Sequence, residues 1–185
     1  MNPEPTPSQT VGPFFHNALL GRELSRLVPP DHSGAIRIEG TVYDGAGEPV
    51  PDAMLEIWQA DEGGCYEHPA DDREVDRRFS GFGRAGTDDA GGFSFVTVKP
   101  GTVPGPEGRA QAPHIIVSIF ARGLLRHLLT RIYFPDEEEA NAVDPVLSVV
   151  EDRDLRKTLI AREEAGILRF DIHLQGDGQT AFFGF

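Results

Sequence analysis

The side chains best able to bind a metal or act as a nucleophile in this 185-residue sequence are six histidines and one cysteine. Cys65 is the only cysteine, so it cannot form an internal disulfide, and no neighbouring base or second thiol would activate it. Five histidines are scattered without a metal-binding spacing, namely His16, His32, His68, His127 and His173. These residue types therefore indicate no independent metal or nucleophile site.

Arg131 is the charged residue with the most specific setting. It lies in the apolar run 128–134, which has the character of a strand. An arginine on a strand that faces a pocket recognises a carboxylate well, because its guanidinium is a fixed charge with forked donors. The acidic run 136–139 follows closely in the sequence, and an ion pair with that run is the competing interpretation.

Short strands are the elements that would position these side chains. Ile36, Ile38 and Val42 alternate with polar residues, and this period of two is typical of a half-buried strand. Further strand-like runs lie at 54–58, 93–98, 114–121, 128–134 and 167–174. Because 15 prolines and 21 glycines break the apolar runs, the pattern predicts an all-β fold, a single-domain β-sandwich with short helices and extended N- and C-terminal arms.

Helices and turns are expected between these strands. Residues 136–142 and 151–164 have helical composition, and the second segment would place Leu155, Leu159 and Ile160 on one face. Arg84 and Asp88 stand close to glycines and are expected in turns with a structural role. The polar stretch 61–80 is long for a connection, and long connections often carry function.

The chain is expected to divide near residue 34. Residues 1–34 are rich in proline and polar residues but contain Phe14 and Phe15, which need burial, so this segment is interpreted as an N-terminal docking arm. Residues 35–185 would form the β-sandwich domain. The apolar end 181–185 is expected to pack against a partner chain, because such a terminus is a liability when exposed.

Composition excludes several classes of function. The net charge of -13, without clustered lysine or arginine, argues against nucleic acid as a partner. The apolar runs are too short for a membrane span, and the first residues lack the features of a signal peptide. Together with the single Cys65, these features favour a cytoplasmic protein.

Several blocks of the sequence resemble the intradiol dioxygenase family in the same order. These blocks are TPSQTVGPFF (6–15), GTVYDGAGEPVPDAMLEIWQADEGGCY (40–66), FSGFGRAGTDDAGGFSFVTVKPG (79–101), PHIIVSIF (113–120) and TRIYFPDEEEAN (130–141). The resemblance implies an enzyme that cleaves catechols between their two hydroxyls with non-haem Fe(III), held by two tyrosinates and two histidines. Ferric iron is a hard Lewis acid, so phenolate ligands suit it.

Two of the four ligand positions that the resemblance implies have lost their donors. Tyr66 matches the first tyrosine, but Val103 stands at the second. His114 matches the first histidine of a His-x-His pair, and Ile116 stands at the second. Two remaining donors would hold ferric iron poorly, so Tyr66 and His114 are interpreted as relic ligand positions and this chain is expected to bind no metal alone.

This pattern is similar to the α-type subunit of the heteromeric family members. The resemblance then implies a homologous β subunit that holds the Fe(III), in a symmetric αβ hetero-oligomer that cleaves protocatechuate with O2 to 3-carboxy-cis,cis-muconate in the β-ketoadipate pathway. This chain would contribute no catalytic residue. Arg131 and the arm residues Thr10, Gly12 and Pro13 match positions that line the substrate pocket, and the lone chain should be inactive.

Two other interpretations remain open from the sequence. The chain could be a self-sufficient dioxygenase with an altered ligand set, such as Tyr66, His114 and His68. It could instead be a non-enzymatic binding sandwich of the transthyretin-like sort, which would share only the hairpin at 40–59.

Overall fold

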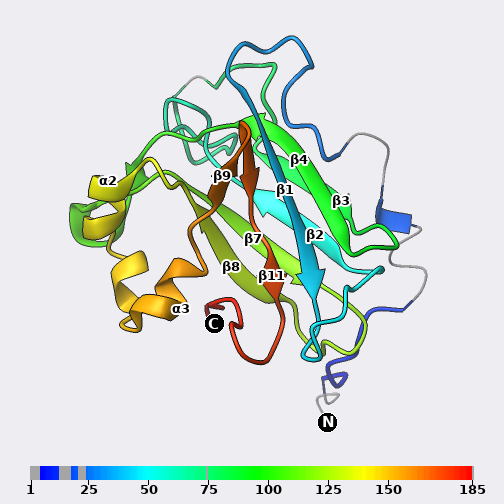
Figure 1. The fold of residues 1–185 in the computed structure, drawn as a ribbon. Coiled ribbons are helices and arrows are strands. Elements are labelled where there is room, and N and C mark those ends of the chain that lie inside the picture. Colours follow the sequence, from blue (N-terminus) through cyan, green and yellow to red (C-terminus); the bar gives the residue numbers. More distant parts are fainter. Residues whose placement is uncertain (1–4, 13–17, 21–23, 74, 185) are drawn as a thin grey trace.

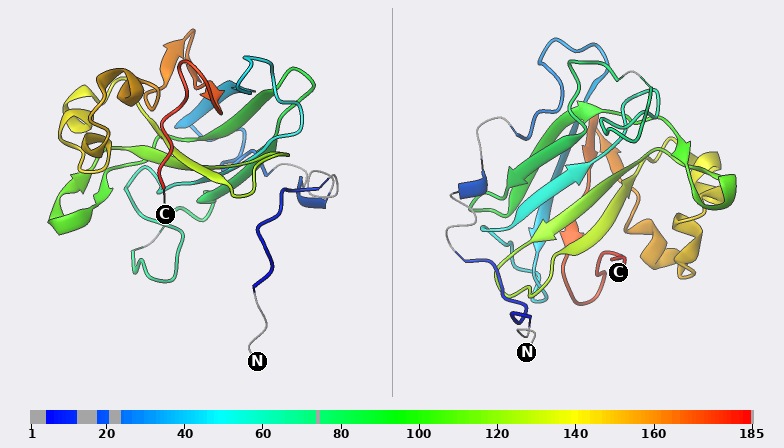
Figure 2. Two further views of the ribbon diagram at one scale, coloured as in Figure 1. Left: turned by 90° about the horizontal axis from the view of Figure 1, so that it is seen from below. Right: turned by 180° about the vertical axis from the view of Figure 1, so that it is seen from behind.

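The chain forms two β-sheets that pack face to face (Figure 1 and Figure 2). The computed structural model describes residues 5–12, 18–20, 24–73 and 75–184. Pro13, Phe14 and Phe15 lie outside these residues. The all-β sandwich expected from the sequence is confirmed.

The first sheet is built around its longest strand, β1 (Ala35–Tyr43). β4 (Gly92–Val98) pairs antiparallel with one edge of β1. The short strands β10 (Ile167–Arg169) and β11 (Ile172–His173) pair parallel with the other edge, and β9 (Arg162–Glu164) extends the sheet from β10.

The second sheet has four antiparallel strands and carries the candidate site. Its strands, in spatial order, are β3 (Phe82–Gly86), β2 (Met54–Trp58), β7 (His114–Phe120) and β8 (Leu128–Tyr133). A small hairpin of β5 (Val103–Pro104) and β6 (Ala110–Gln111) precedes β7, with the one-turn 3₁₀ helix η1 (Pro106–Gly108) at its tip. The short helices α2 (Glu138–Val143), η2 (Leu147–Val149) and α3 (Arg153–Lys157) follow β8.

The core lies between the two sheets because each strand alternates apolar and polar residues. Ile38 and Val42 of β1 are fully buried, while Arg37 and Glu39 face outward, as the period of two predicts. Ile115, Val117 and Ile119 of β7 are buried on the facing sheet, and each such side chain contributes about 1.5–3 kcal/mol when fully removed from water. The same alternation sends His114 and Ile116 to the outer face of β7.

Arg84, expected to be structural in a turn or hairpin, has a structural role but lies in the middle of β3 and not in a turn. Two glycines and an arginine give this segment little intrinsic strand preference. It becomes a strand by pairing with β2, and the Arg84 side chain donates to the Glu56 carboxylate directly across the pair. Gly83 permits this packing, since a Cβ there would lie 2.6 Å from Leu27 Cδ1.

The expected helix over 151–164 is also mostly wrong. Only α3 is helical, and it begins at the cap residue Asp152, whose carboxylate accepts hydrogen bonds from the backbone of Asp154 and Leu155. The chain then turns back, since Tyr133 donates to the Leu159 carbonyl and accepts from the Ala161 amide. Pairing with the end of β8 therefore replaces the helix, and Leu155 is 37% exposed.

The expected single strand over 167–174 is interrupted at Phe170. The Phe170 amide donates to the carbonyl of Glu39, and its own carbonyl passes over Gly40 so closely that a Cβ on Gly40 would lie 1.8 Å from it. The segment therefore forms two short strands, β10 and β11, on either side of this crossing. The alternation was a correct sign of strand structure but could not locate the break.

Residues 24–28, here called the edge segment, close the side of the sandwich between β3 and β4. The Leu24 carbonyl accepts from Arg84 of β3, and the Ser25 carbonyl accepts from Val96 of β4. Leu27 donates to the Val96 carbonyl and accepts from the Ser80 amide, and its side chain is buried in the core. The last part of the expected arm is therefore integral to the sandwich, while Figure 2 shows residues 5–12 extending away from the two sheets.

The apolar end of the chain packs against its own sheet. The Phe183 amide donates to the Leu129 carbonyl of β8, and Ala181 is buried in a small second core with Tyr133, Leu147 and Leu159. In the described part of the chain, no helix is both long enough and apolar enough to cross a membrane.

Candidate functional site

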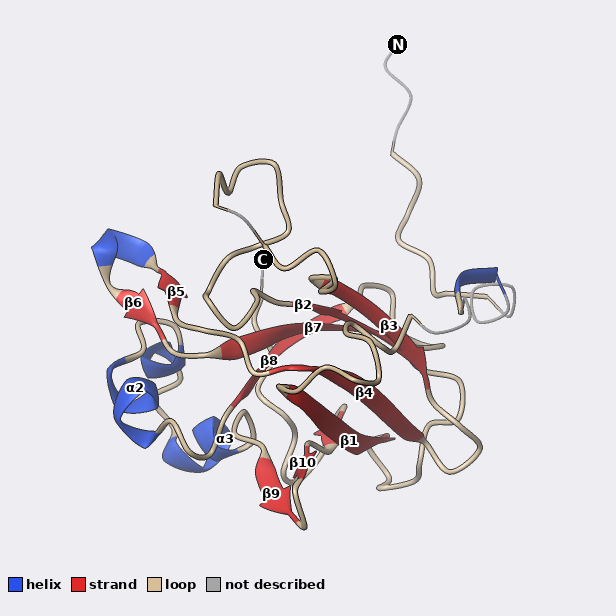
Figure 3. Cartoon of the chain, turned by 90° about the horizontal axis from the view of Figure 1, so that it is seen from above, coloured by secondary structure: helices blue, strands red, loops and turns tan. Residues whose placement is uncertain are grey.

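The candidate site lies on the outer face of the four-stranded sheet. Trp58 of β2, Ile116 of β7 and Arg131 of β8 stand side by side in register across this face. The loop between β2 and β3 and the β5–β6 hairpin rise on the same side, away from β1 and β4 (Figure 3). The sheet thus supplies a floor, and these two connections supply the walls.

Tyr66 lies in the loop after β2 and is held over the sheet by local hydrogen bonds. Its backbone amide donates to the Asp71 carboxylate, 2.9 Å away. Its ring is nearly parallel to that of Trp58, with the centroids 6.0 Å apart. Burial raises the pKa of the Tyr66 phenol, and the nearby Arg131 charge acts in the opposite direction. The net direction is upward, so the phenol is neutral at pH 7.

A cavity of about 600 Å³ opens beside Tyr66 on the side of the loop. It is lined by Trp58, Tyr66, His68, Ala70, Asp71, Asp72, Arg73 and Pro104. Arg73 donates to the Asp71 carboxylate and to the Gly64 carbonyl, and its hydrogen bond is the main cause that holds the pKa of Asp71 far below its usual value. These interactions tie the loop into a fixed shape at the cavity rim.

Gly64 fixes the loop against the strand that carries Val103. Its φ of +75° is in the left-handed region, and a Cβ there would lie 2.2 Å from the Thr102 carbonyl oxygen. We expect Gly64→Ala to lower the free energy of unfolding by about 2–4 kcal/mol, since strain and a backbone clash add. Gly108, with φ +74° and open space around it, is the matched control. Urea unfolding of both variants measures the difference, and equal losses would mean that the close approach to Thr102 contributes nothing.

His114 begins β7 and is buried, with 4% of its surface exposed. Its Nδ1 lies 2.7 Å from the Ala112 carbonyl oxygen, which can only accept, so Nδ1 carries the hydrogen and Nε2 the lone pair in the neutral ring. Burial, and next the Arg131 charge, lower the pKa of His114 to about 4. The ring is therefore neutral at physiological pH.

The lowered pKa of His114 makes stability depend on pH. The unfolded chain takes up a proton near the usual value of 6.5, whereas the folded chain does so only near 4, so acid favours unfolding within that window. Lowering the pH from 7 to 4 should cost up to roughly 3 kcal/mol through this residue. His114→Gln should flatten this dependence of the free energy of unfolding on pH in urea titrations at pH 4.5, 5.5 and 7. The same slope in wild type and His114→Gln would contradict the assignment.

Arg131 projects from β8 beside these two residues, and its described hydrogen bonds go to neutral groups. Its Nη1 donates to Gln111 Oε1 at 2.8 Å and to the Tyr133 hydroxyl at 3.3 Å. Its guanidinium also lies over the Phe183 ring, 5.9 Å from the centroid. The competing interpretation, an ion pair with the acidic run 136–139, is wrong, because among the described residues Arg131 bonds to Gln111 and Tyr133 and forms no ion pair with that run. Lys99 pairs with Asp136 and Glu137 instead.

The sequence analysis did not identify Asp144, which supports Arg131 through the Tyr133 hydroxyl. Its carboxylate is fully buried and accepts hydrogen bonds from the backbone of Ala112, Val146 and Leu147. The Tyr133 hydroxyl donates to the same carboxylate at 3.2 Å. The only signal in the sequence was the Asp144-Pro145 pair, which is typical of a turn and says nothing of burial.

The residues at the four ligand positions do not fit ferric iron. Val103 is buried and Ile116 half-buried, and neither has a donor atom. In the alternative of a self-sufficient enzyme, His68 would be a third ligand beside Tyr66 and His114. Its Nδ1 accepts a hydrogen bond from the Ala70 amide. Within the described ranges, no three histidine, cysteine, aspartate or glutamate side chains gather in a way that could hold a metal.

Of the arm residues, Thr10 lies elsewhere on the sheet. Thr10 Oγ1 accepts a hydrogen bond from the Gly123 amide, in the turn between β7 and β8. Gly12 has open space where a Cβ would be, and Pro13 lies outside the described residues. The structure therefore brings Tyr66, His114 and Arg131 together and places Thr10 at the end of the strands.

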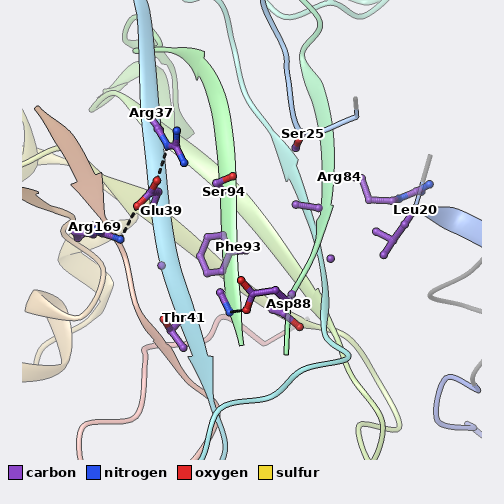
Figure 4. A pocket seen from close by; sticks show the side chains of 15 residues that line it. Leu20, Ser25, Arg37, Glu39, Thr41, Arg84, Asp88, Phe93, Ser94 and Arg169 are labelled. Carbon is purple, nitrogen blue, oxygen red and sulfur yellow. Dashed lines mark hydrogen bonds and ion pairs between the residues drawn. The ribbon is translucent and has the colours of Figure 1, made fainter. Parts of the chain in front are cut away.

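A second, polar cavity of about 590 Å³ lies along the side of the sandwich, lined by residues of β1, β4 and β3 (Figure 4). Its charged side chains are already paired with one another or with neighbours. The Glu39 carboxylate contacts both Arg37 and Arg169, and Arg84 contacts Glu56. In this respect the cavity differs from the surroundings of Arg131, and it is not the candidate site.

Comparison with known proteins places the chain in a family. Residues 11–176 match the model of a family described as "Dioxygenase". A protocatechuate 3,4-dioxygenase alpha chain from Pseudomonas putida is 45% identical, with 97% of this chain and 96% of that protein covered. A protocatechuate 3,4-dioxygenase beta chain from Burkholderia cepacia is 37% identical, over 78% of this chain and 66% of that protein.

A solved structure shows the same fold. The dioxygenase domain of a dioxygenase and carbohydrate-binding protein fusion from Streptomyces sp. SirexAA-E covers 94% of this chain and 99% of its own, with a TM-score of 0.57 and 27% identity. The sequence family and the fold agree. The chain therefore belongs to the intradiol dioxygenase family and is similar over nearly its whole length to a protocatechuate 3,4-dioxygenase alpha chain.

Proposed function

We propose that this chain is the α-type subunit of a protocatechuate 3,4-dioxygenase and that a homologous β subunit holds the ferric iron. The observation that carries the proposal is the combination of whole-length similarity to an alpha chain with donors at only two of the four ligand positions, Tyr66 and His114. Iron, when bound by the partner, supplies the Lewis acid that makes the catecholate reactive towards O2. The product would be 3-carboxy-cis,cis-muconate.

The residues of this chain would shape the substrate pocket rather than perform the cleavage. Arg131 supports this role, because its described hydrogen bonds go to neutral oxygens and its charge is available to a carboxylate. Protocatechuate carries a carboxylate on its ring. In the complex, Arg131 would orient this group, while the arm residues Thr10, Gly12 and Pro13 would cover the pocket and exclude water.

The partner would be a β subunit in a symmetric αβ hetero-oligomer located in the cytoplasm. The docking arm, expected at 1–34, would consist chiefly of the residues before the edge segment, since residues 24–28 belong to the sandwich. An apolar groove supports docking near the arm. Its lining includes Val11, Leu124, Leu125 and Phe182, between the β7–β8 turn and the end of the chain.

Co-expression with a candidate β chain tests the proposal. The purified αβ complex and the lone full-length chain are compared for iron content and for oxygen uptake with protocatechuate. We expect iron and oxygen uptake only in the complex. Iron binding and oxygen uptake by the lone chain would contradict the proposal and favour a self-sufficient enzyme with Tyr66, His114 and His68 as ligands.

A further inference from the structure

We infer that the guanidinium of Arg131 occupies the space between the four ligand positions and that this fixed cation, in addition to the two missing donors, keeps iron out of this chain. The inference rests on the ligand positions used in the proposed function, residues 66, 103, 114 and 116. It concerns this chain's own residues and not the iron of a partner.

The pairing of β7 with β8 places two of these positions next to Arg131. Ile116 is directly opposite Arg131, and His114 is directly opposite Tyr133. Directly opposed residues of antiparallel strands have Cβ atoms about 4.5–5.5 Å apart on the same face. Ile116 therefore directly adjoins the arginine, and His114 is its diagonal neighbour, in the next residue pair on the same face of the strands.

The third ligand position, Val103, is linked to Arg131 through its strand partner Gln111. Val103 pairs with Gln111 in the β5–β6 hairpin. The Gln111 side chain accepts the hydrogen bond from Arg131 Nη1, 2.8 Å away. The hairpin that would have presented a tyrosine at position 103 thus presents a neutral amide oxygen to a cation.

Tyr66, the fourth ligand position, lies over the same face of the sheet. Its ring stacks on Trp58, which is opposite Ile116 on β2, so Tyr66 lies over the same row of the sheet as Arg131. Burial and next the Arg131 charge lower the pKa of His114, and at Tyr66 the Arg131 charge opposes the rise in pKa that burial causes. One positive charge is therefore felt at both surviving donors.

A guanidinium at this place has consequences that a neutral side chain would not have. Arginine does not lose its proton in proteins, so the charge is permanent. A metal cation that approached Tyr66 and His114 would be repelled by it, in a partly buried setting where screening is weak. The same charge would attract an anion, so the loss of the metal changed a cation-binding site into a site that prefers negative groups.

Restoring the ligands with and without Arg131 tests the inference. The full-length variants are Val103→Tyr/Ile116→His and the triple variant that adds Arg131→Gln. Adding Arg122→Gln instead is the matched control, because Arg122 is an exposed arginine paired with Asp52. After anaerobic loading with Fe(II), exposure to air and gel filtration, iron content and the visible absorption of an iron–phenolate bond are measured.

We expect the Arg131→Gln triple variant to retain close to one iron per chain and to be coloured, whereas the double variant and the Arg122→Gln control retain little. Iron retained equally by all three would overturn the inference, because the arginine would then be no barrier. Iron absent from all three would overturn it as well, because removal of the cation would have admitted nothing.

A single substitution gives a second measurement that does not require a rebuilt centre. Arg131→Gln alone, with circular dichroism as in wild type, should bind Co(II) at least about tenfold more tightly than wild type or Arg122→Gln in calorimetric titrations. Equal affinities in the three proteins would overturn the inference. Neither measurement uses oxygen uptake or a partner chain, so its failure is distinct from failure of the proposed function.

Discussion

Replacing Arg131 with alanine in the αβ complex should raise the KM for protocatechuate roughly 10- to 100-fold, because a charge-assisted hydrogen bond to a carboxylate contributes about 1.5–3 kcal/mol. Catechol has the same two hydroxyls but no carboxylate, so its KM should change by less than about twofold. Steady-state oxygen uptake with both substrates, measured on the same enzyme preparation, gives the comparison directly.

The effect of Arg131→Ala must be separated from a general disturbance of the sheet. Arg122→Ala removes an equally charged side chain from the β7–β8 turn, where it pairs with Asp52 at the surface, and should leave both KM values unchanged. Arg131→Lys keeps the charge but loses the forked donors, so an intermediate KM is expected. A loss of the same size for protocatechuate and catechol would rule out recognition of the carboxylate by Arg131.

Asp144→Ala should lower the free energy of unfolding by about 3–5 kcal/mol, the largest stability effect that we expect at the site. The carboxylate is fully buried and accepts from three backbone amides, at Ala112, Val146 and Leu147. Alanine would leave these amides and the Tyr133 hydroxyl without their acceptor, away from water. Urea unfolding followed by circular dichroism measures the loss.

Two variants control the Asp144 experiment. Asp154→Ala removes an exposed carboxylate that pairs with Lys157 at the surface and should change the free energy of unfolding by less than about 0.5 kcal/mol. Asp144→Asn keeps one acceptor oxygen and should lie between alanine and wild type. If Asp144→Ala cost no more than Asp154→Ala, the hydrogen bonds to this carboxylate would not support the site.

The sequence predicts the strands of the core well because each carries its own signal. Alternation in β1 and the apolar run of β7 depend only on neighbouring residues, so both could be located before any contact was known. β3 is different, because Gly83 and Arg84 become a strand through pairing with β2 and through the Glu56 ion pair. Tertiary contacts, and not local preference, decide such segments.

The candidate site was predictable as far as the family resemblance reached. Tyr66, His114 and Arg131 were identified from their motifs, and the structure brings them together on one face of the sheet. Gln111 and Asp144 were not identified, because Gln111 bonds to Arg131, 20 positions away, and Asp144 bonds to Ala112, 32 positions away. A sequence motif identifies residues at the reaction site, whereas the residues that support them can be identified only from the folded structure.

The edge segment has a consequence for the way this chain meets a partner. The outer strands β3 and β4 would otherwise present free backbone groups, which are templates for pairing with another chain and for aggregation. Residues 24–28 form backbone hydrogen bonds with both strands, and they follow the N-terminal arm in the sequence. In the proposed complex, a partner that bound the arm would therefore also stabilise this closed side of the sandwich, and the free energy of association would add to the stability of this chain.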